Sequence, residues 1–447
     1  MVKRIFAAFL CILMVLSIAS CGTEEAKTET LDTVETKVES EEKNDKNDEK
    51  KTEEVKEEVK YDRVDTPLTP ERVAAIPIAR EGMTTDELRQ ICVDYVKLSV
   101  SFQWVPNESF DYKANQGGGT PVHFEEGKLH GGIPYINVSS GNLYRMLEFY
   151  DVETGVLDVS YLSKNTIIFG TACSGTTGWG WARVINSAVC AWTAQLNANA
   201  GLIPVGPYTY DLSTHRFGED GKEDCDVIAK RNGEQVMYES YALSKKADCF
   251  VNKGHVRMNG ADPVVVRNAD GTIDGEKSYI VQVEQGLFTT GSYHGRVSAD
   301  GVEYVIQGNE GKKGDGSDFY YTFKDLYKTG YLPHTFKEFH GQDPIEPATV
   351  SIDVTGDTVS FDALNAATVT ANYVISDVFT VLTDTEGKQV IRYAYRLDHH
   401  YSRKASLKDH LPKAYLWQYR DKGYTVSLEV QLGNGELLTA YTGTLVP

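Results

Sequence analysis

The amino-acid sequence predicts an α+β protein that carries an all-β region at its C-terminal end. Three observations support this class. Helix patterns come first, strand patterns follow them without alternating helices, and the region after residue 343 is almost entirely strand-like. Helices that precede a run of antiparallel strands favour α+β over the alternating α/β class.

The chain opens with a pattern typical of exported proteins. Two basic residues precede an apolar run from Ile5 to Leu16, which is short for a transmembrane helix but typical of a signal peptide. The sequence Ile18-Ala19-Ser20-Cys21 then resembles the lipobox of bacterial lipoproteins. This resemblance implies that residues 1–21 are a signal and that Cys21 carries a lipid. We therefore expect an extracytoplasmic protein anchored to the bacterial cell membrane; an ordinary signal peptide with a chance cysteine is the alternative.

Residues 22–66 have the composition of a tether. They hold 17 acidic and nine basic side chains and almost no large apolar ones, so they cannot bury enough surface to offset the entropy of ordering. We expect a disordered acidic spacer, with a solvated single helix as the alternative. The whole chain has a formal charge of −19 and shows no cluster of Lys and Arg, which argues against a nucleic-acid partner.

Five cysteines lie outside the export signal, and each needs an explanation. Cys92 and Cys190 fall on apolar helical faces, which predicts buried free thiols. Cys225 and Cys249 share a polar, loop-rich segment and could form a disulfide. Cys173 is the remaining one.

Two helices can be placed from their patterns. Thr84 and Glu87 form a capping box at the start of an amphipathic helix, so residues 67–120 are expected to be a helical segment that packs on the following domain. A second helix is expected to begin near Cys173, because apolar side chains recur at spacings of three and four on one face: Trp181, Val184, Ile185, Ala188, Val189 and Trp192.

Strand patterns dominate the rest of the chain. Residues 263–286 predict two strands joined through Asp-Gly turns, within a mixed domain at 121–343. Residues 344–447 predict a separate all-β domain, described best as a sandwich. Within it, apolar and polar residues alternate over 424–432 and run into a Gly433-Asn434-Gly435 turn, as in a half-buried antiparallel strand.

The position of Cys173 is compatible with a nucleophile. Unpaired N–H groups and the dipole at a helix start favour a thiolate and can stabilise an oxyanion. Ser174 and Gly175 are small enough for a substrate to approach. A buried, inert cysteine is the alternative on these local features alone. A nucleophile also needs a base, and that base must be oriented.

His255 is the candidate base. It stands at the start of a strand, and a following strand places Gln282 and Glu284 on one face because side chains repeat every two residues. If the two strands pair, Glu284, or alternatively Gln282, would hold the ring of His255.

Three short segments now resemble one family. ACSG at 172–175, GHV at 254–256 and GIPY at 132–135 are similar to the signatures of NlpC-type cysteine peptidases, papain-like enzymes that cleave amide bonds in peptidoglycan stem peptides. The resemblance implies a papain-like catalytic domain with Cys173 as nucleophile, His255 as base and Tyr135 as a helper whose hydroxyl lies near the thiol. Glu284 is closer to the related CHAP amidases, in which Glu or Asn follows the histidine strand.

The chain departs from that pattern at several places. Ala172 stands where the family usually has Asp, residues 137–140 replace a glycine pair, and insertions precede both Cys173 and His255. These departures concern substrate specificity because they would reshape the cleft.

The resulting hypothesis is a lipid-anchored cysteine hydrolase acting on peptidoglycan through Cys173, His255 and Glu284. Tyr135 and the backbone at Cys173 and Ser174 would hold the oxyanion. No metal or organic cofactor is expected, and Trp179 is a candidate for a substrate groove, although core packing is equally compatible with it. Two alternatives are kept: a non-catalytic papain-like lipoprotein that binds wall fragments or a partner protein, and a cysteine hydrolase for another acyl substrate.

Overall fold

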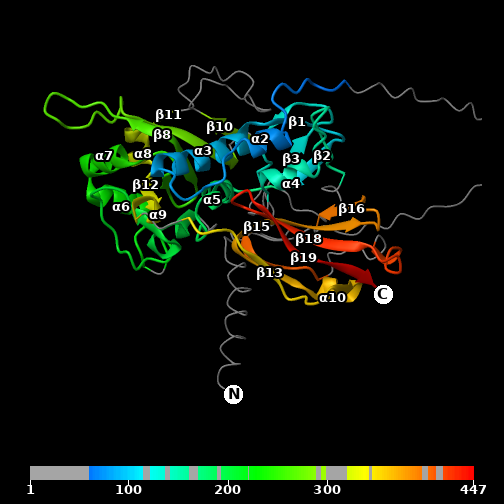
Figure 1. Cartoon of the computed structure of the whole chain (residues 1–447). Helices are drawn as coiled ribbons and strands as arrows, with labels where there is room; N and C mark the ends of the chain where they lie inside the picture. The colour runs from blue at the N-terminus through cyan, green and yellow to red at the C-terminus, as the bar shows by residue number, and fades with distance from the viewer. Residues whose placement is uncertain are drawn as a thin grey trace, which may run out of the picture. The chain divides into compact units, whose positions relative to one another are not determined.

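The computed structural model of the 447-residue chain is shown in Figure 1. It describes residues 60–113, 121–135, 141–160, 170–188, 193–219, 221–287, 293–297, 320–341, 345–394, 401–408 and 416–447. These residues belong to one compact unit that runs from Glu58 to Pro447. No helix in the described ranges is both long and apolar enough to cross a membrane. Several sequence predictions concern residues outside these ranges: the signal peptide, Cys21, most of the tether, Cys190 and Trp192.

The helical segment predicted over 67–120 is confirmed only up to Ser101, because residues 103–106 and 110–113 form strands. Helix α2 spans Pro70–Ala74 and α3 spans Thr85–Ser101. Thr84 and Glu87 form the predicted capping box in both directions, since the Thr84 hydroxyl accepts from the Glu87 N–H and the Glu87 carboxylate accepts from the Thr84 N–H. One face of α3 packs against α5, and Cys92 on that helix is a buried free thiol, as predicted.

Small sheets follow α3. Strand β1 (Gln103–Pro106) pairs with β4 (His130–Gly131) and β5 (Val156–Leu157). Strand β2 (Phe110–Lys113) pairs with β3 (Pro121–Phe124), and α4 spans Leu143–Leu147.

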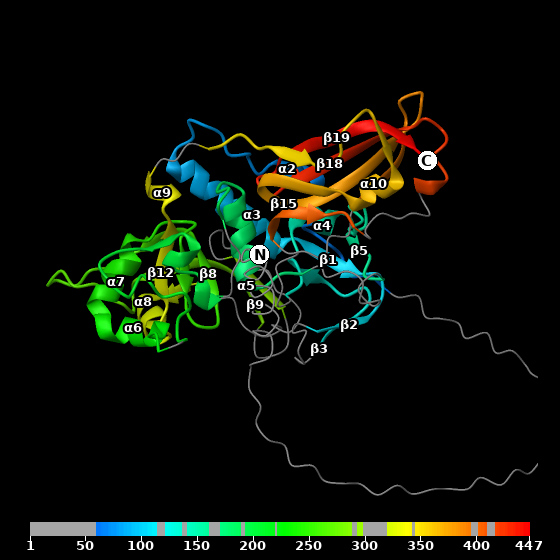
Figure 2. The ribbon, with the colours of Figure 1, turned by 90° about the horizontal axis from the view of Figure 1, so that it is seen from below.

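Helix α5 covers Cys173–Ala182, and all ten of its residues are buried. It lies beside α3 in Figure 2, where Gly180 allows the close approach because a Cβ there would lie 2.4 Å from Val96. The helix begins where predicted but ends earlier. Val184, Ile185 and Ala188 are buried in turns beyond it, so their apolar spacing reflected burial and not continued helix.

A seven-stranded sheet forms the centre of the mixed region, with the order β10-β9-β8-β7-β12-β6 and β11 paired to β9. Every pairing in it is antiparallel. The strands are β6 (Leu202–Pro204), β7 (Cys249–Val251), β8 (Val256–Val264), β9 (Tyr279–Leu287), β10 (Tyr293–Val297), β11 (Tyr320–Thr322) and β12 (Leu332–Phe336). Of the two strands predicted within 263–286, β9 is confirmed, whereas the first is wrong because β8 ends at Val264 and residues 265–278 form turns and an isolated bridge.

Helices cover both faces of this sheet. Alternate residues of β7 show the division: Cys249 and Val251 belong to the hydrophobic cluster that includes α3 and α5, whereas Phe250 belongs to the cluster of α6, α7 and α8. These last helices span Cys225–Asn232, Glu234–Leu243 and Phe323–Lys328; α9 (Glu338–Gly341) and two 3₁₀ turns (Thr193–Gln195, Ala198–Ala200) complete the region. The mixed α+β class is confirmed.

The C-terminal part is strand-rich, as predicted, and includes the short helix α10 (Phe361–Ala366). Its strands form one connected sheet with the order β13-β15-β18-β19-β14, in which β16 and β17 also pair with β15. Val426, Leu428, Val430 and Leu432 are buried on one side of β18, which confirms the predicted alternation. The strands are β13 (Val350–Ile352), β14 (Thr358–Ser360), β15 (Thr368–Thr383), β16 (Gln389–Ala394), β17 (Ser402–Ser406), β18 (Thr425–Leu432) and β19 (Leu437–Val446).

Candidate active site

Cys173 is the first residue of α5. The preceding Ala172 has an extended backbone, and no side chain caps this end of the helix. The thiol is nearly enclosed, since Cys173 is 4% exposed. The chain reaches the helix through Thr171, which forms a parallel bridge with Tyr135 and donates its N–H to the carbonyl of Pro134. The helix start is therefore fixed against the 132–135 segment.

His255 lies in the tight connection between β7 and β8. The side chain of Asn252 holds this turn, because its Oδ1 accepts from the N–H groups of Gly254 and His255 at 3.0 and 2.8 Å. The His255 side chain is 20% exposed, while the Glu284 side chain on β9 is fully buried. His255 Nε2 lies 2.6 Å from Glu284 Oε2. The antiparallel pairing of β8 with β9 brings these two predicted residues together.

The thiol of Cys173 forms a hydrogen bond with the ring of His255. Since Nε2 faces Glu284, Nδ1 is the ring nitrogen left for the thiol. Burial opposes a thiolate here, but the charge and hydrogen bond of His255, together with backbone N–H groups of Val256 and Ser174, lower the pKa of Cys173 below its usual 9.0. The arrangement favours charge separation between thiol and ring.

The interaction between the thiol and the ring has the opposite effect on the pKa of the histidine, which it raises. Burial disfavours the imidazolium, yet the neighbouring Cys173 and Glu284 raise the pKa of His255 from 6.5 to about 9. A thiolate and an imidazolium can therefore coexist near neutral pH, which is the state required of a cysteine nucleophile.

Tyr135 also reaches the thiol, as predicted. Its hydroxyl forms a hydrogen bond with Cys173, and burial followed by the nearby thiolate raises the pKa of Tyr135, so the phenol keeps its proton. The half-buried Tyr135 can thus donate to a negative charge at this position. Ser174 is buried and contributes its backbone N–H at the sulfur.

Two polar residues that the sequence analysis did not single out also lie at the site. Gln285 accepts from the Thr176 hydroxyl on α5 and donates to the carbonyl of Ile133, so it ties the nucleophile helix to the Tyr135 segment. Arg257, the second residue of β8, forms an ion pair with Glu284. The available signal was their register: Arg257 lies two residues after His255, and Gln285 directly follows Glu284.

Two predicted site residues have other roles. Gln282 accepts a hydrogen bond from Arg257, whereas Glu284 is the residue that bonds the ring of His255. Trp179 is 2% exposed and packs edge-on against Tyr401 with ring centroids 5.2 Å apart, so it is a core residue and lines no groove.

The predicted disulfide between Cys225 and Cys249 is wrong. Both are free and buried, and they lie in different hydrophobic clusters. Cys225 opens α6 among the residues around Phe250, while Cys249 points to the opposite side of β7 because successive strand residues alternate.

The structure has one hollow beside the site and another that includes none of its central residues. One, of about 430 Å³, is lined by His255 together with Asp224, Cys225, Asp226, Asn252, Lys253, Gly254 and Thr329, so the exposed edge of the ring opens onto it. The other, of about 220 Å³, contains none of the three central residues.

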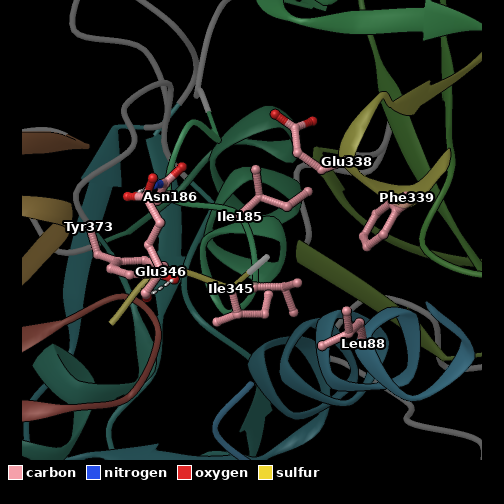
Figure 3. A pocket seen from close by; sticks show the side chains of 9 residues that line it. Leu88, Ile185, Asn186, Glu338, Phe339, Ile345, Glu346 and Tyr373 are labelled. Carbon is pink, nitrogen blue, oxygen red and sulfur yellow. Dashed lines mark hydrogen bonds between the residues drawn. The ribbon is translucent and has the colours of Figure 1, made fainter. Parts of the chain in front are cut away.

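Figure 3 shows that second hollow, where Leu88, Ile185 and Ile345 form an apolar side and Asn186 bonds Glu346 at 2.8 Å. Because none of Cys173, His255 and Glu284 lines it, we assign it no role in the proposed chemistry. The described residues contain no group of three or more His, Cys, Asp or Glu side chains arranged to hold a metal ion. His399, His400 and His410 lie outside the described ranges.

Comparison with known proteins gave no relative: no family model matches the chain, and neither a curated protein nor a solved structure matches it. The functional argument therefore depends on the site itself.

Proposed function

We propose that this protein is a cysteine hydrolase that cleaves amide bonds in peptidoglycan stem peptides. The observation that carries the proposal is the continuous hydrogen-bonded chain from Cys173 through His255 to the buried carboxylate of Glu284, with the Tyr135 hydroxyl at the same thiol. Nucleophile, base, orienting acid and oxyanion donor are the four parts of such a mechanism.

In the proposed reaction the Cys173 thiolate attacks the amide carbonyl. The backbone N–H groups at the start of α5 and the Tyr135 hydroxyl stabilise the oxyanion. The His255 imidazolium then gives its proton to the leaving amine, which leaves an acyl-enzyme thioester. A water molecule, deprotonated by His255, hydrolyses the thioester and restores the thiolate–imidazolium pair.

The wall substrate and the location rest on sequence resemblance. The segments similar to NlpC-type peptidases include each of the residues that meet at the thiol, and the lipobox-like segment at Cys21 would hold the enzyme outside the cytoplasm. In this proposal the mixed region is papain-like, and the C-terminal strands form a sandwich that binds wall polymer or places the catalytic region against it.

Two other functions would use the same chain. A non-catalytic lipoprotein that binds wall fragments or a partner protein would not depend on the thiol, and a hydrolase for another acyl substrate would keep the dyad but cut a different bond.

One experiment separates the three functions. The full-length protein is incubated with defined muropeptides, and the products are identified by mass spectrometry, with Cys173→Ala as the matched control. We expect a new amine and carboxyl terminus within the stem peptide for the parent only. Tight binding without cleavage by both proteins would favour the binding function, and cleavage of esters but not muropeptides would favour another acyl substrate.

A further inference from the structure

We propose that Arg257 is a positioning residue of this site, which holds the Glu284 carboxylate against His255 and so forms the fourth member of the chain that begins at Cys173. The inference deepens the proposed hydrolase function and rests on it. Neither the sequence resemblance nor the three-residue mechanism assigns a role to this arginine.

One oxygen of Glu284 has a nitrogen of His255 and a nitrogen of Arg257 beside it. Arg257 Nη1 lies 3.2 Å from Glu284 Oε2, and the same Oε2 is 2.6 Å from His255 Nε2. His255 directly precedes β8 and Arg257 is the second residue of that strand, where the register with β9 places it opposite Glu284. The carboxylate is thereby fixed from two directions.

The guanidinium is itself held in place. It donates to Gln282, stacks over the ring of Tyr321 at 3.9 Å from the centroid and lies 4.9 Å from that of Tyr331. The Arg257 side chain is 10% exposed. Because the group is buried among these partners, we assign it no contact with substrate.

A buried carboxylate needs a partner throughout the reaction. While His255 is an imidazolium, it supplies the positive charge; once its proton passes to the leaving amine, Glu284 would be a lone buried anion. Arg257 keeps its charge through both states, so Glu284 stays ionised and the His255 ring keeps its orientation. Cys173 and Tyr135 lie on one side of His255, and Glu284, Arg257, Tyr321 and Tyr331 on the other. The hollow beside the ring adds the titratable or charged side chains of Asp224, Cys225, Asp226 and Lys253.

The test is the pH dependence of Cys173 alkylation in the full-length protein, followed by mass spectrometry of the Cys173 peptide. Without Arg257, Glu284 can take up a proton and the imidazolium loses its counter-charge. We expect Arg257→Met to move the alkylation midpoint upward by about one pH unit or more, and to lower kcat on the cleaved muropeptide about 10- to 100-fold with little change in KM. Arg257→Lys should restore part of the shift.

Glu284→Gln identifies the route of the effect. If Arg257 acts through Glu284, the double variant should have the same midpoint as Glu284→Gln alone, because the two changes remove one interaction. Arg89→Met is the matched control, since Arg89 is also buried and paired with a carboxylate, Asp248, and its loss should leave the midpoint unchanged.

Two results would overturn the inference: a parent-like midpoint in folded Arg257→Met, or shifts that add in the double variant. If Arg257→Met does not fold, Arg257→Gln is measured and judged by the same two criteria. A slow, ordinary alkylation of Cys173 in the parent would instead refute the proposed hydrolase function, so the two failures are distinguishable.

Discussion

Arg89 on α3 and Arg257 on β8 are both buried, both stack on an aromatic ring and both pair with a carboxylate, but the two carboxylates differ in their other contacts. Asp248 is enclosed by Arg89 at 2.6 Å and by the N–H of Lys245 at 2.8 Å. Arg89 also donates to the carbonyl of Lys246 and to Thr335, so it joins α3 to β7 and β12. This pair connects elements of the fold.

Glu284, by contrast, forms a hydrogen bond with the ring of His255, which can gain and lose a proton. His255 stands between that carboxylate and a thiol, and its exposed edge opens onto a hollow. The difference teaches that a buried ion pair becomes chemically useful when one of its contacts titrates near neutral pH and leads to solvent.

The largest expected effect concerns His255, the group in this comparison that gains and loses a proton. His255→Ala removes the base and the counter-charge of the thiolate, and burial then raises the pKa of Cys173 above its usual 9.0. We expect turnover of the muropeptide to fall about 10³-fold or more, with the thermal midpoint little changed. A variant that retained more than a tenth of the parent activity would show that His255 is not the base.

The next effect tests the enclosed pair. Arg89→Met leaves Asp248 buried without its counter-charge, which should destabilise the protein by about 3–5 kcal/mol in denaturant unfolding. The alkylation profile of Cys173 in the folded variant should match the parent. A shifted profile would contradict the view that this pair serves the fold alone.

A smaller effect is expected at the oxyanion. Tyr135→Phe keeps the ring but removes the hydroxyl that bonds Cys173. Turnover should fall about 10- to 100-fold, somewhat less than the loss of a dedicated oxyanion donor, because the backbone donors remain. An unchanged rate in steady-state assays would assign Tyr135 to packing only.

The smallest effect concerns the cysteines away from the site. Because Cys225 and Cys249 are free, adding a reductant should leave the thermal midpoint unchanged. A drop of several degrees on reduction would show that a disulfide joins them after all.

Sequence reasoning predicted the parts of the site that follow from local rules. The capping box at Thr84, the helix start at Cys173 and the two-residue repeat that aligns Glu284 with His255 are all short-range patterns. Tyr135 came from the resemblance of its segment, and the structure places its hydroxyl at the thiol.

The features that the sequence could not predict depend on packing between elements that are far apart in the chain. The sequence is equally compatible with a groove and a core position for Trp179, because the ring that packs against it, Tyr401, lies far along the chain. Arg257 is unremarkable as a letter in a strand; only the pairing of β8 with β9 puts its charge beside a buried carboxylate. The disulfide prediction failed for the same reason, since proximity in sequence does not fix the face of a strand on which a thiol lies.

The measurement that tests the central claim most directly is the alkylation rate of Cys173 against pH in the parent and in His255→Ala. The pKa of Cys173 is lowered and that of His255 is raised to about 9, so the thiolate–imidazolium pair should exist below about pH 9. We expect the parent rate to rise well below pH 9 and to stay high, while the variant rises only above it. Equal, slow profiles in both proteins would contradict the account and make Cys173 a packing residue.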